Sequence, residues 1–200
     1  MRVVEILEDS VWSVWYDGEK DDIFSLLLEQ WQDAEYIHSY FHAHRSLIDN
    51  YTFWQNCSFQ DVMTSAINEA RNLESYFLQL YRNSEAGLSP NIEDKFILLG
   101  RNEVYDGSVS RRKMYGKLRK TYPPSVLRLY ALRLDSRQTD EPPIFIITGG
   151  GIKLTEKMSQ MPELQKELDH LQKVKTWLST KGVFTKEDFY TFKNNYVQKH

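Results

Sequence analysis

The chain has 200 residues, of which 41% are hydrophobic and 14% aromatic, with a formal net charge of -3 and a single cysteine, Cys57. This composition can supply a sizeable core, which argues against disorder, and one cysteine cannot form an intramolecular disulfide. No apolar run approaches 18 residues, and residues 1–10 lack the basic start and apolar stretch of a secretory signal. We therefore expect a single soluble domain in the cytoplasm, without membrane contact.

The N-terminal part, residues 1–83, predicts one or two strands followed by two helices. β-Branched and aromatic residues dominate Val3–Asp17, which is typical of strands. Apolar residues then recur at helical spacing over Asp22–Ile48, which predicts one long helix. Ser58 and Asp61 form a capping-box pattern at the start of a second helix, and the two helices are expected to pack as an antiparallel hairpin.

The C-terminal part, residues 94–200, predicts a sheet with further helices. Val126–Leu134 and Ile144–Thr148 are rich in β-branched and other apolar residues, and the short polar turn between them predicts an antiparallel hairpin. The second strand is expected to end at Gly149–Gly151, either as a plain turn or as a cradle for phosphate. The remaining expected elements are a strand Phe96–Leu99, a basic loop over 101–124, a helix Pro162–Thr180 and a last helix opened by the capping box Thr185–Asp188.

Together these elements predict an α+β fold. It would have an antiparallel sheet of about four to five strands, an N-terminal helical hairpin and C-terminal helices, all in one domain over residues 1–200.

Charge is distributed unevenly along the chain. Residues 1–100 hold 6 Lys and Arg against 17 Asp and Glu, whereas residues 101–133 hold 9 against 2. Tyr105, Tyr115 and Tyr122 are interleaved with the basic residues, and tyrosine rings can stack on unpaired bases while Lys and Arg neutralise phosphates. The basic segment therefore indicates binding of nucleic acid, or alternatively a solvated loop or a surface that docks on the acidic N-terminal helices.

Two arginines of the predicted strand Val126–Leu134 need an anionic partner. Arg128 and Arg133 have opposite parity, so they are expected on opposite faces of the sheet. Each either grips a phosphate or forms a structural salt bridge. His38 and His42 share a helix face, but the Glu of an H-E-x-x-H motif is missing, so no metal site and no cofactor are expected.

Three segments resemble the C-terminal half of RelE/ParE-type toxins, in the HigB-like branch. They are L-R-L-Y-A-L-R-L at 127–134, I-F-I-I-T-G-G-G-I-K-L-T at 144–155 and P-E-L-Q-K-E-L at 162–168. The N-terminal V-W-Y-D-G-E-K-D-D at 14–22 and L-L-L-E-Q-W-Q-D-A-E-Y at 26–36 are similar to a group of longer bacterial proteins with the same ending. The chain is about twice as long as the compact members of the toxin family.

This resemblance implies a small antiparallel sheet with helices packed on it, and it implies a function. Active members cleave messenger RNA, often on the ribosome, and are neutralised by an antitoxin that is frequently a helix-turn-helix protein. The expectation is therefore a toxin that acts as an endoribonuclease without metal. The alternative is a non-catalytic interaction protein of the same fold, which binds a partner or nucleic acid through its basic segment.

The candidate site residues form two groups. The catalytic candidates are Arg128, Arg133, Lys113 and Tyr115. The candidates for nucleic-acid binding are Arg111, Arg112, Lys117, Arg119, Lys120 and Lys153.

Overall fold

The computed structural model describes residues 1–49, 54, 56–88, 92–99, 109–117 and 124–197, and in this part of the chain six strands form one sheet in the order β1-β2-β6-β5-β4-β3. Neighbouring strands are antiparallel except for the parallel pair β2–β6. The strands are β1 (Arg2–Leu7), β2 (Val11–Trp15), β3 (Ile97–Leu98), β4 (Ser110–Tyr115), β5 (Leu127–Leu134) and β6 (Ile144–Ile152). The α+β prediction is confirmed, with a larger and partly parallel sheet.

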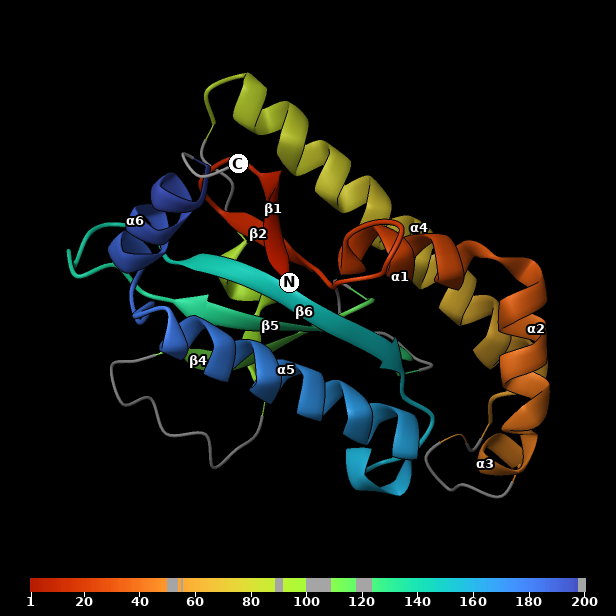
Figure 1. Ribbon diagram of the computed structural model, residues 1–200. Helices are drawn as coiled ribbons and strands as arrows, with labels where there is room; N and C mark the ends of the chain where they lie inside the picture. Colours follow the sequence, from red (N-terminus) through yellow and green to blue (C-terminus); the bar gives the residue numbers. More distant parts are fainter. Residues whose placement is uncertain (50–53, 55, 89–91, 100–108, 118–123, 198–200) are drawn as a thin grey trace.

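Helices cover both faces of the sheet (Figure 1). They are α1 (Ile23–Gln32), α2 (Ala34–Ala43), α3 (Arg45–Asp49), α4 (Phe59–Glu85), α5 (Pro162–Thr180) and α6 (Lys186–Val197). Side chains of α5 lie against Gly149 and Gly151, whereas Leu27 and Trp31 of α1 lie against Gly150. Because successive residues of a strand point to opposite faces, α5 and α1 pack on opposite sides of β6. No helix among the described residues is long and apolar enough to cross a membrane.

The predicted hairpin of β5 and β6 is confirmed and forms the centre of the core. The two strands pair antiparallel, from Leu127 opposite Ile152 to Leu134 opposite Ile144. Nearly all of their side chains are buried, which is expected for strands covered by helices on both faces. The one or two strands predicted within Val3–Asp17 are present as two, β1 and β2, which pair antiparallel.

The single long helix predicted over Asp22–Ile48 is wrong. Asp33 has an extended backbone, with ψ 113°, and ends α1. Its carboxylate accepts hydrogen bonds from the backbone N–H groups of Glu35 and Tyr36, so the same residue caps the start of α2. The apolar spacing is nearly continuous across this break, and for that reason periodicity alone does not reveal it.

Two further boundaries differ from the predictions. Residues 110–115, expected within a loop, form the strand β4 between β3 and β5. Strand β6 does not end at Thr148 but continues through the three glycines to Ile152, so these glycines form neither a turn nor a phosphate cradle. Glycine is required there because α1 and α5 approach the β6 backbone closely from both sides.

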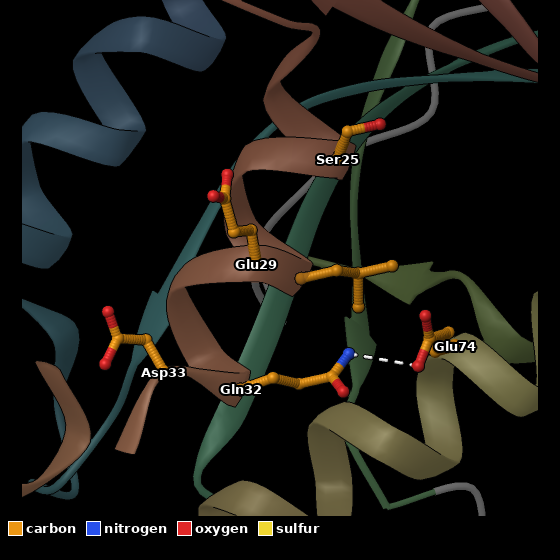
Figure 2. Close-up of a pocket in the computed structure, with 6 residues that line it drawn as sticks. Ser25, Glu29, Gln32, Asp33 and Glu74 are labelled. Carbon is orange, nitrogen blue, oxygen red and sulfur yellow. Dashed lines mark hydrogen bonds between the residues drawn. The ribbon is translucent and has the colours of Figure 1, made fainter. Parts of the chain in front are cut away.

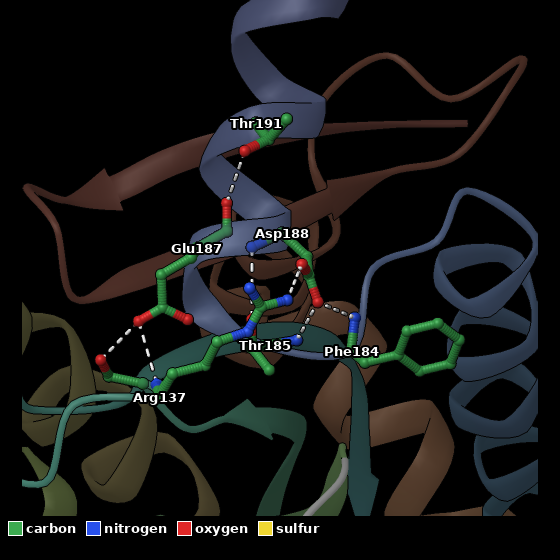
Figure 3. A network of polar contacts seen from close by, with 7 residues as sticks. Arg137, Phe184, Thr185, Glu187, Asp188 and Thr191 are labelled. Atoms are coloured by element: carbon green, nitrogen blue, oxygen red, sulfur yellow. Dashed lines mark hydrogen bonds and ion pairs between the residues drawn. The ribbon is translucent and has the colours of Figure 1, made fainter.

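Both predicted capping boxes are present. Ser58 and Asp61 exchange the expected hydrogen bonds at the start of α4, and Thr185 and Asp188 do so at the start of α6. The start of α6 also holds the turn between β5 and β6, because the carboxylates of Glu187 and Asp188 accept hydrogen bonds from Arg137 (Figure 3). This network fixes the hairpin to the C-terminal helix.

Replacing Gly150 by alanine is expected to destabilise the fold by roughly 1–3 kcal/mol, the usual cost of overpacking a well-filled core. The new Cβ would lie 2.7 Å from the carbonyl oxygen of Arg128 and 2.9 Å from both Leu27 and Trp31. Urea unfolding of the variant and the parent measures the loss. An unchanged unfolding midpoint would contradict the packing described at this glycine.

Candidate anion-binding site

Three of the predicted site residues come together on one face of the sheet, beside Tyr130. Lys113 and Tyr115 lie on β4, where they pair with Tyr130 and Arg128 of β5. Cross-strand partners share a face of the sheet, so these four side chains lie together. They surround a cavity of about 170 Å³ beside the segment that joins β6 to α5. The cavity, which we call the cation pocket, is lined by Leu99, Lys113, Tyr115, Arg128, Tyr130, Lys153, Glu156 and Met158.

Arg128 is held rigidly in the wall of the cation pocket. Its Nη1 donates hydrogen bonds to the carbonyl oxygens of Ser125 at 2.8 Å and Leu127 at 2.7 Å. Its guanidinium carbon lies 4.0 Å from the centroid of the Tyr115 ring, in a cation–π contact. The residue is only 6% exposed, and burial lowers the pKa of its guanidinium. Among the described residues it forms no ion pair with a carboxylate.

Two lysines add positive charge to the same pocket. The Nζ of Lys113 donates to the carbonyl oxygen of Leu99 at 2.8 Å, and the Nζ of Lys153 donates to that of Glu156 at 2.6 Å. Burial, followed by the charges of Arg128 and Lys113, lowers the pKa of Lys153 from 10.5 to about 8. At pH 7 roughly nine-tenths of the Lys153 side chains are still protonated. The pocket therefore carries three cations at neutral pH.

Cations gathered in a partly buried cavity, with no carboxylate paired to them among the described residues, favour an anionic ligand. Glu156 lines the pocket and its charge acts on Lys153, but it is exposed and its hydrogen bond with Lys153 is made through the backbone carbonyl. Tyr130 is fully buried, and its hydroxyl lies 3.8 Å from the Sδ of Met158. It was not among the predicted site residues, although its shared parity with Arg128 is a signal that the sequence contains.

Arg133 does not line the cation pocket. It lies on the opposite face of the sheet from Arg128, as the parity predicted. Its Nη1 lies 2.5 Å from the carboxylate of Glu93, and its Nε lies 2.8 Å from that of Asp135. These contacts match the structural salt bridge that was one of its two predicted roles.

The other basic candidates do not line the cation pocket. Arg111 lies on the same face of β4 as Lys113, while Arg112 lies on the opposite face and donates from Nε to the Ser110 hydroxyl at 3.1 Å. The side chains of Arg111, Arg112 and Lys117 are partly buried. The remaining candidates, Arg119 and Lys120, lie outside the described residues.

A second cavity differs in character from the cation pocket. It is an open groove of about 560 Å³ between α1 and α4, and its charged lining residues are the acidic Glu29, Asp33 and Glu74 (Figure 2). Gln32 donates to Glu74 across it at 3.1 Å. This groove repels anions. The rings of His38 and His42 are tilted, with centroids 4.1 Å apart, and no group of three or more metal-ligating side chains occurs in the part of the chain that the structure describes.

Inorganic phosphate is expected to stabilise the protein more at pH 7 than at pH 9.5, by roughly 2–8 °C in melting temperature at concentrations well above Kd. The lowered pKa of Lys153 means that the folded state binds fewer protons than the unfolded state between about pH 8 and 10.5. Its stability therefore rises with pH through that window, as the cost of burying the charge disappears. A bound anion offsets this cost only while Lys153 is charged, which is below about pH 8.

Thermal unfolding with and without phosphate at the two pH values measures this effect. The other titratable groups that line the pocket are Lys113, Tyr115, Arg128, Tyr130 and Glu156. The variant Lys153→Met should lose most of the difference between pH 7 and pH 9.5. Equal stabilisation of the parent at both pH values would contradict the assigned role of Lys153.

The chain matches no protein-family model, and no curated protein or solved structure is significantly similar to it.

Proposed function

We propose that the cation pocket binds a phosphate group of single-stranded RNA and that the protein is a toxin-type endoribonuclease that acts without metal. The observation that carries this proposal is the buried Arg128, which has no carboxylate partner among the described residues and lies beside Lys113 and Lys153. The resemblance to RelE/ParE-type toxins of the HigB-like branch supports the proposal, because that family acts on RNA with basic residues. The antiparallel strands β4, β5 and β6 with helices packed on them agree with the fold that the resemblance implies.

The proposed chemistry is attack of a ribose 2′-hydroxyl on the adjacent phosphate. The 2′-oxygen forms a bond to phosphorus, the bond from phosphorus to the 5′-oxygen breaks, and the products are a 2′,3′-cyclic phosphate and a 5′-hydroxyl. Arg128 stabilises the charge that builds on the phosphoryl oxygens, since it is fixed in advance by two backbone carbonyls and by Tyr115.

Two proton transfers accompany this reaction. One proton leaves the 2′-hydroxyl, and another is delivered to the 5′-oxygen. A group with a pKa near neutral pH is best suited to such transfers, and Lys153, with a pKa of about 8, fits this requirement. Lys113 and Tyr115 line the same cavity and are the other candidates.

The resemblance also suggests a neutralising antitoxin, frequently a helix-turn-helix protein. Such a partner would inactivate the enzyme by covering the cation pocket, and an acidic segment would complement its three positive charges. We propose that the protein meets messenger RNA, on or off the ribosome, in the cytoplasm.

The test is cleavage of a short single-stranded RNA in excess chelator, with the same sequence also supplied as a message in a translating extract. We expect products that end in 2′,3′-cyclic phosphate, and no cleavage at a nucleotide whose 2′-hydroxyl is replaced by hydrogen. Binding of the RNA without cleavage in either setting would reject the catalytic proposal. It would favour the alternative, a non-catalytic protein that binds through the same pocket.

A further inference from the structure

The free hydrogen-bond donors of the cation pocket define what kind of anion it can hold. Both N–H groups of the Arg128 Nη1 are used by backbone carbonyls, so its Nε and Nη2 donors remain for a ligand. This edge of a guanidinium suits two oxygens of one phosphate. Lys113 and Lys153 each use one donor on a backbone carbonyl and keep two. Donors of three cationic side chains that line the cavity are thus available to one compact group.

The size of the pocket limits the ligand further. Its volume of about 170 Å³ is below the roughly 300 Å³ at which pockets for small organic molecules begin. Fully buried Tyr130 and the 6% exposed Arg128 form its inner wall. A phosphate at the end of a chain can enter such a site fully, whereas a phosphate inside a chain, with a sugar on each side, can present only its two non-bridging oxygens at the mouth of the pocket.

The charge of the pocket also favours a terminal phosphate. A phosphodiester carries one negative charge, but a phosphate monoester has a second pKa of about 6 and carries close to two at neutral pH. The lining holds three cations and one carboxylate, that of Glu156, which forms no ion pair with them among the described residues, so its net charge of about +2 is better matched by the dianion. We propose that the cation pocket binds a terminal phosphate monoester of a nucleic-acid strand in preference to a phosphodiester within the strand.

This inference rests on the proposed function only in placing phosphate in this pocket. It is compatible with cleavage, because the pentacoordinate phosphorus that forms during attack by the 2′-oxygen also bears two negative charges. A site complementary to that species favours dianions over the diester substrate. Strands that end in a phosphate monoester therefore inhibit cleavage by occupying the pocket.

The experiment compares three single-stranded 2′-O-methyl oligonucleotides of one sequence, which cannot be cleaved because the 2′-hydroxyl is blocked. One has a 3′-phosphate, one has a 5′-phosphate and one has a hydroxyl at both ends. We expect at least one phosphorylated strand to bind roughly tenfold or more tightly than the third, since the extra charge adds charge-assisted hydrogen bonds. The phosphorylated strand that binds more tightly identifies which end enters the cation pocket, and inorganic phosphate should compete with that strand.

Two variants and one control make the result specific to the pocket. Lys113→Met and Lys153→Met should each lose most of the preference, while Lys173→Met, on the exposed side of α5, should keep it. Thermal unfolding verifies that each variant is folded. Equal affinity for all three strands, or a preference that survives both pocket variants, would overturn the inference.

The outcomes also separate this inference from the proposed function. A preference for terminal phosphate without any RNA cleavage supports the inference and rejects the proposal that the protein is a nuclease. RNA cleavage by a protein that shows no preference supports the nuclease and rejects the inference.

Discussion

Replacing Arg128 by alanine should abolish RNA cleavage, relieve any growth arrest caused by the parent protein, and weaken RNA binding by roughly 10–100-fold. The loss corresponds to removal of the charge-assisted hydrogen bonds that a preorganised arginine makes to a phosphate. Arg133→Ala should leave cleavage and binding nearly unchanged, because Arg133 lies on the other face of the sheet and is paired with Glu93 and Asp135. It should instead lower the free energy of unfolding by roughly 1–3 kcal/mol.

The two single variants and the double variant are compared by growth on induced expression, by RNA titration and by thermal unfolding. The double variant should combine the two losses, because the sites lie on opposite faces and share no described partner. Equal and mild effects of the two single substitutions, with no growth arrest by the parent, would reject the catalytic proposal in favour of an interaction protein.

Replacing Glu69 by alanine should destabilise the fold by roughly 3–5 kcal/mol. Glu69 lies on α4 and is 1% exposed. Its carboxylate accepts hydrogen bonds from the backbone N–H groups of Val126 and Leu127 and from the hydroxyls of Ser125 and Ser65. Alanine would leave two buried N–H groups without a partner. Glu74→Ala is the matched control on the same helix, where one hydrogen bond to Gln32 is lost and the effect should stay below about 1 kcal/mol.

The effect of Glu69→Ala should depend on pH. Burial, only partly offset by the hydrogen bonds, raises the pKa of the Glu69 carboxyl. A raised pKa means that the contribution of Glu69 to stability is fully present below the ordinary carboxyl pKa and is lost as pH rises through the folded-state pKa. Urea unfolding should therefore show a larger loss at pH 5 than at pH 8. A loss that grows from pH 5 to pH 8 would contradict this account.

Glu69 also links the core to the cation pocket. It fixes the backbone at Ser125, Val126 and Leu127, and two carbonyls of that segment hold the Arg128 guanidinium. We therefore regard Glu69 as a positioning residue for Arg128. No local pattern in the sequence reveals this role, because the contact joins residues about 57 positions apart.

The strands β5 and β6 could be predicted because their apolar, β-branched runs leave little choice of structure. Strand β4 could not be predicted from the sequence. Its sequence S-R-R-K-M-Y is polar, in part because Lys113 and Tyr115 face the cation pocket. The residues that line the pocket therefore remove the apolar pattern by which a strand is predicted. The continuation of β6 through three glycines was missed for a related reason, since the need for glycine arises from the close approach of α1 and α5.

The sequence predicted the kinds of residue at the candidate site, but it did not predict which of these residues lie together. Lys113, Tyr115, Arg128 and Lys153 were candidates by residue type, and the structure places all four in one cavity. Strand register decides which basic side chains share a face, and parity alone separated Arg128 from Arg133 without saying which one faces the pocket. The partner Glu93 of Arg133 lies 40 positions away in the sequence, so its salt bridge is likewise invisible there.

If the cations of this pocket hold an RNA phosphate, binding must weaken with salt, and a salt titration measures this directly. A short single-stranded RNA is titrated with the parent and with Lys113→Met at about 50 and 200 mM salt. If two or three cations contact phosphate, affinity should fall roughly 7–20-fold over this range. For Lys113→Met, the slope of log affinity against log salt should be less steep by about 0.7, because one contact is gone. No binding by the parent at low salt, or the same slope for both proteins, would contradict the claim.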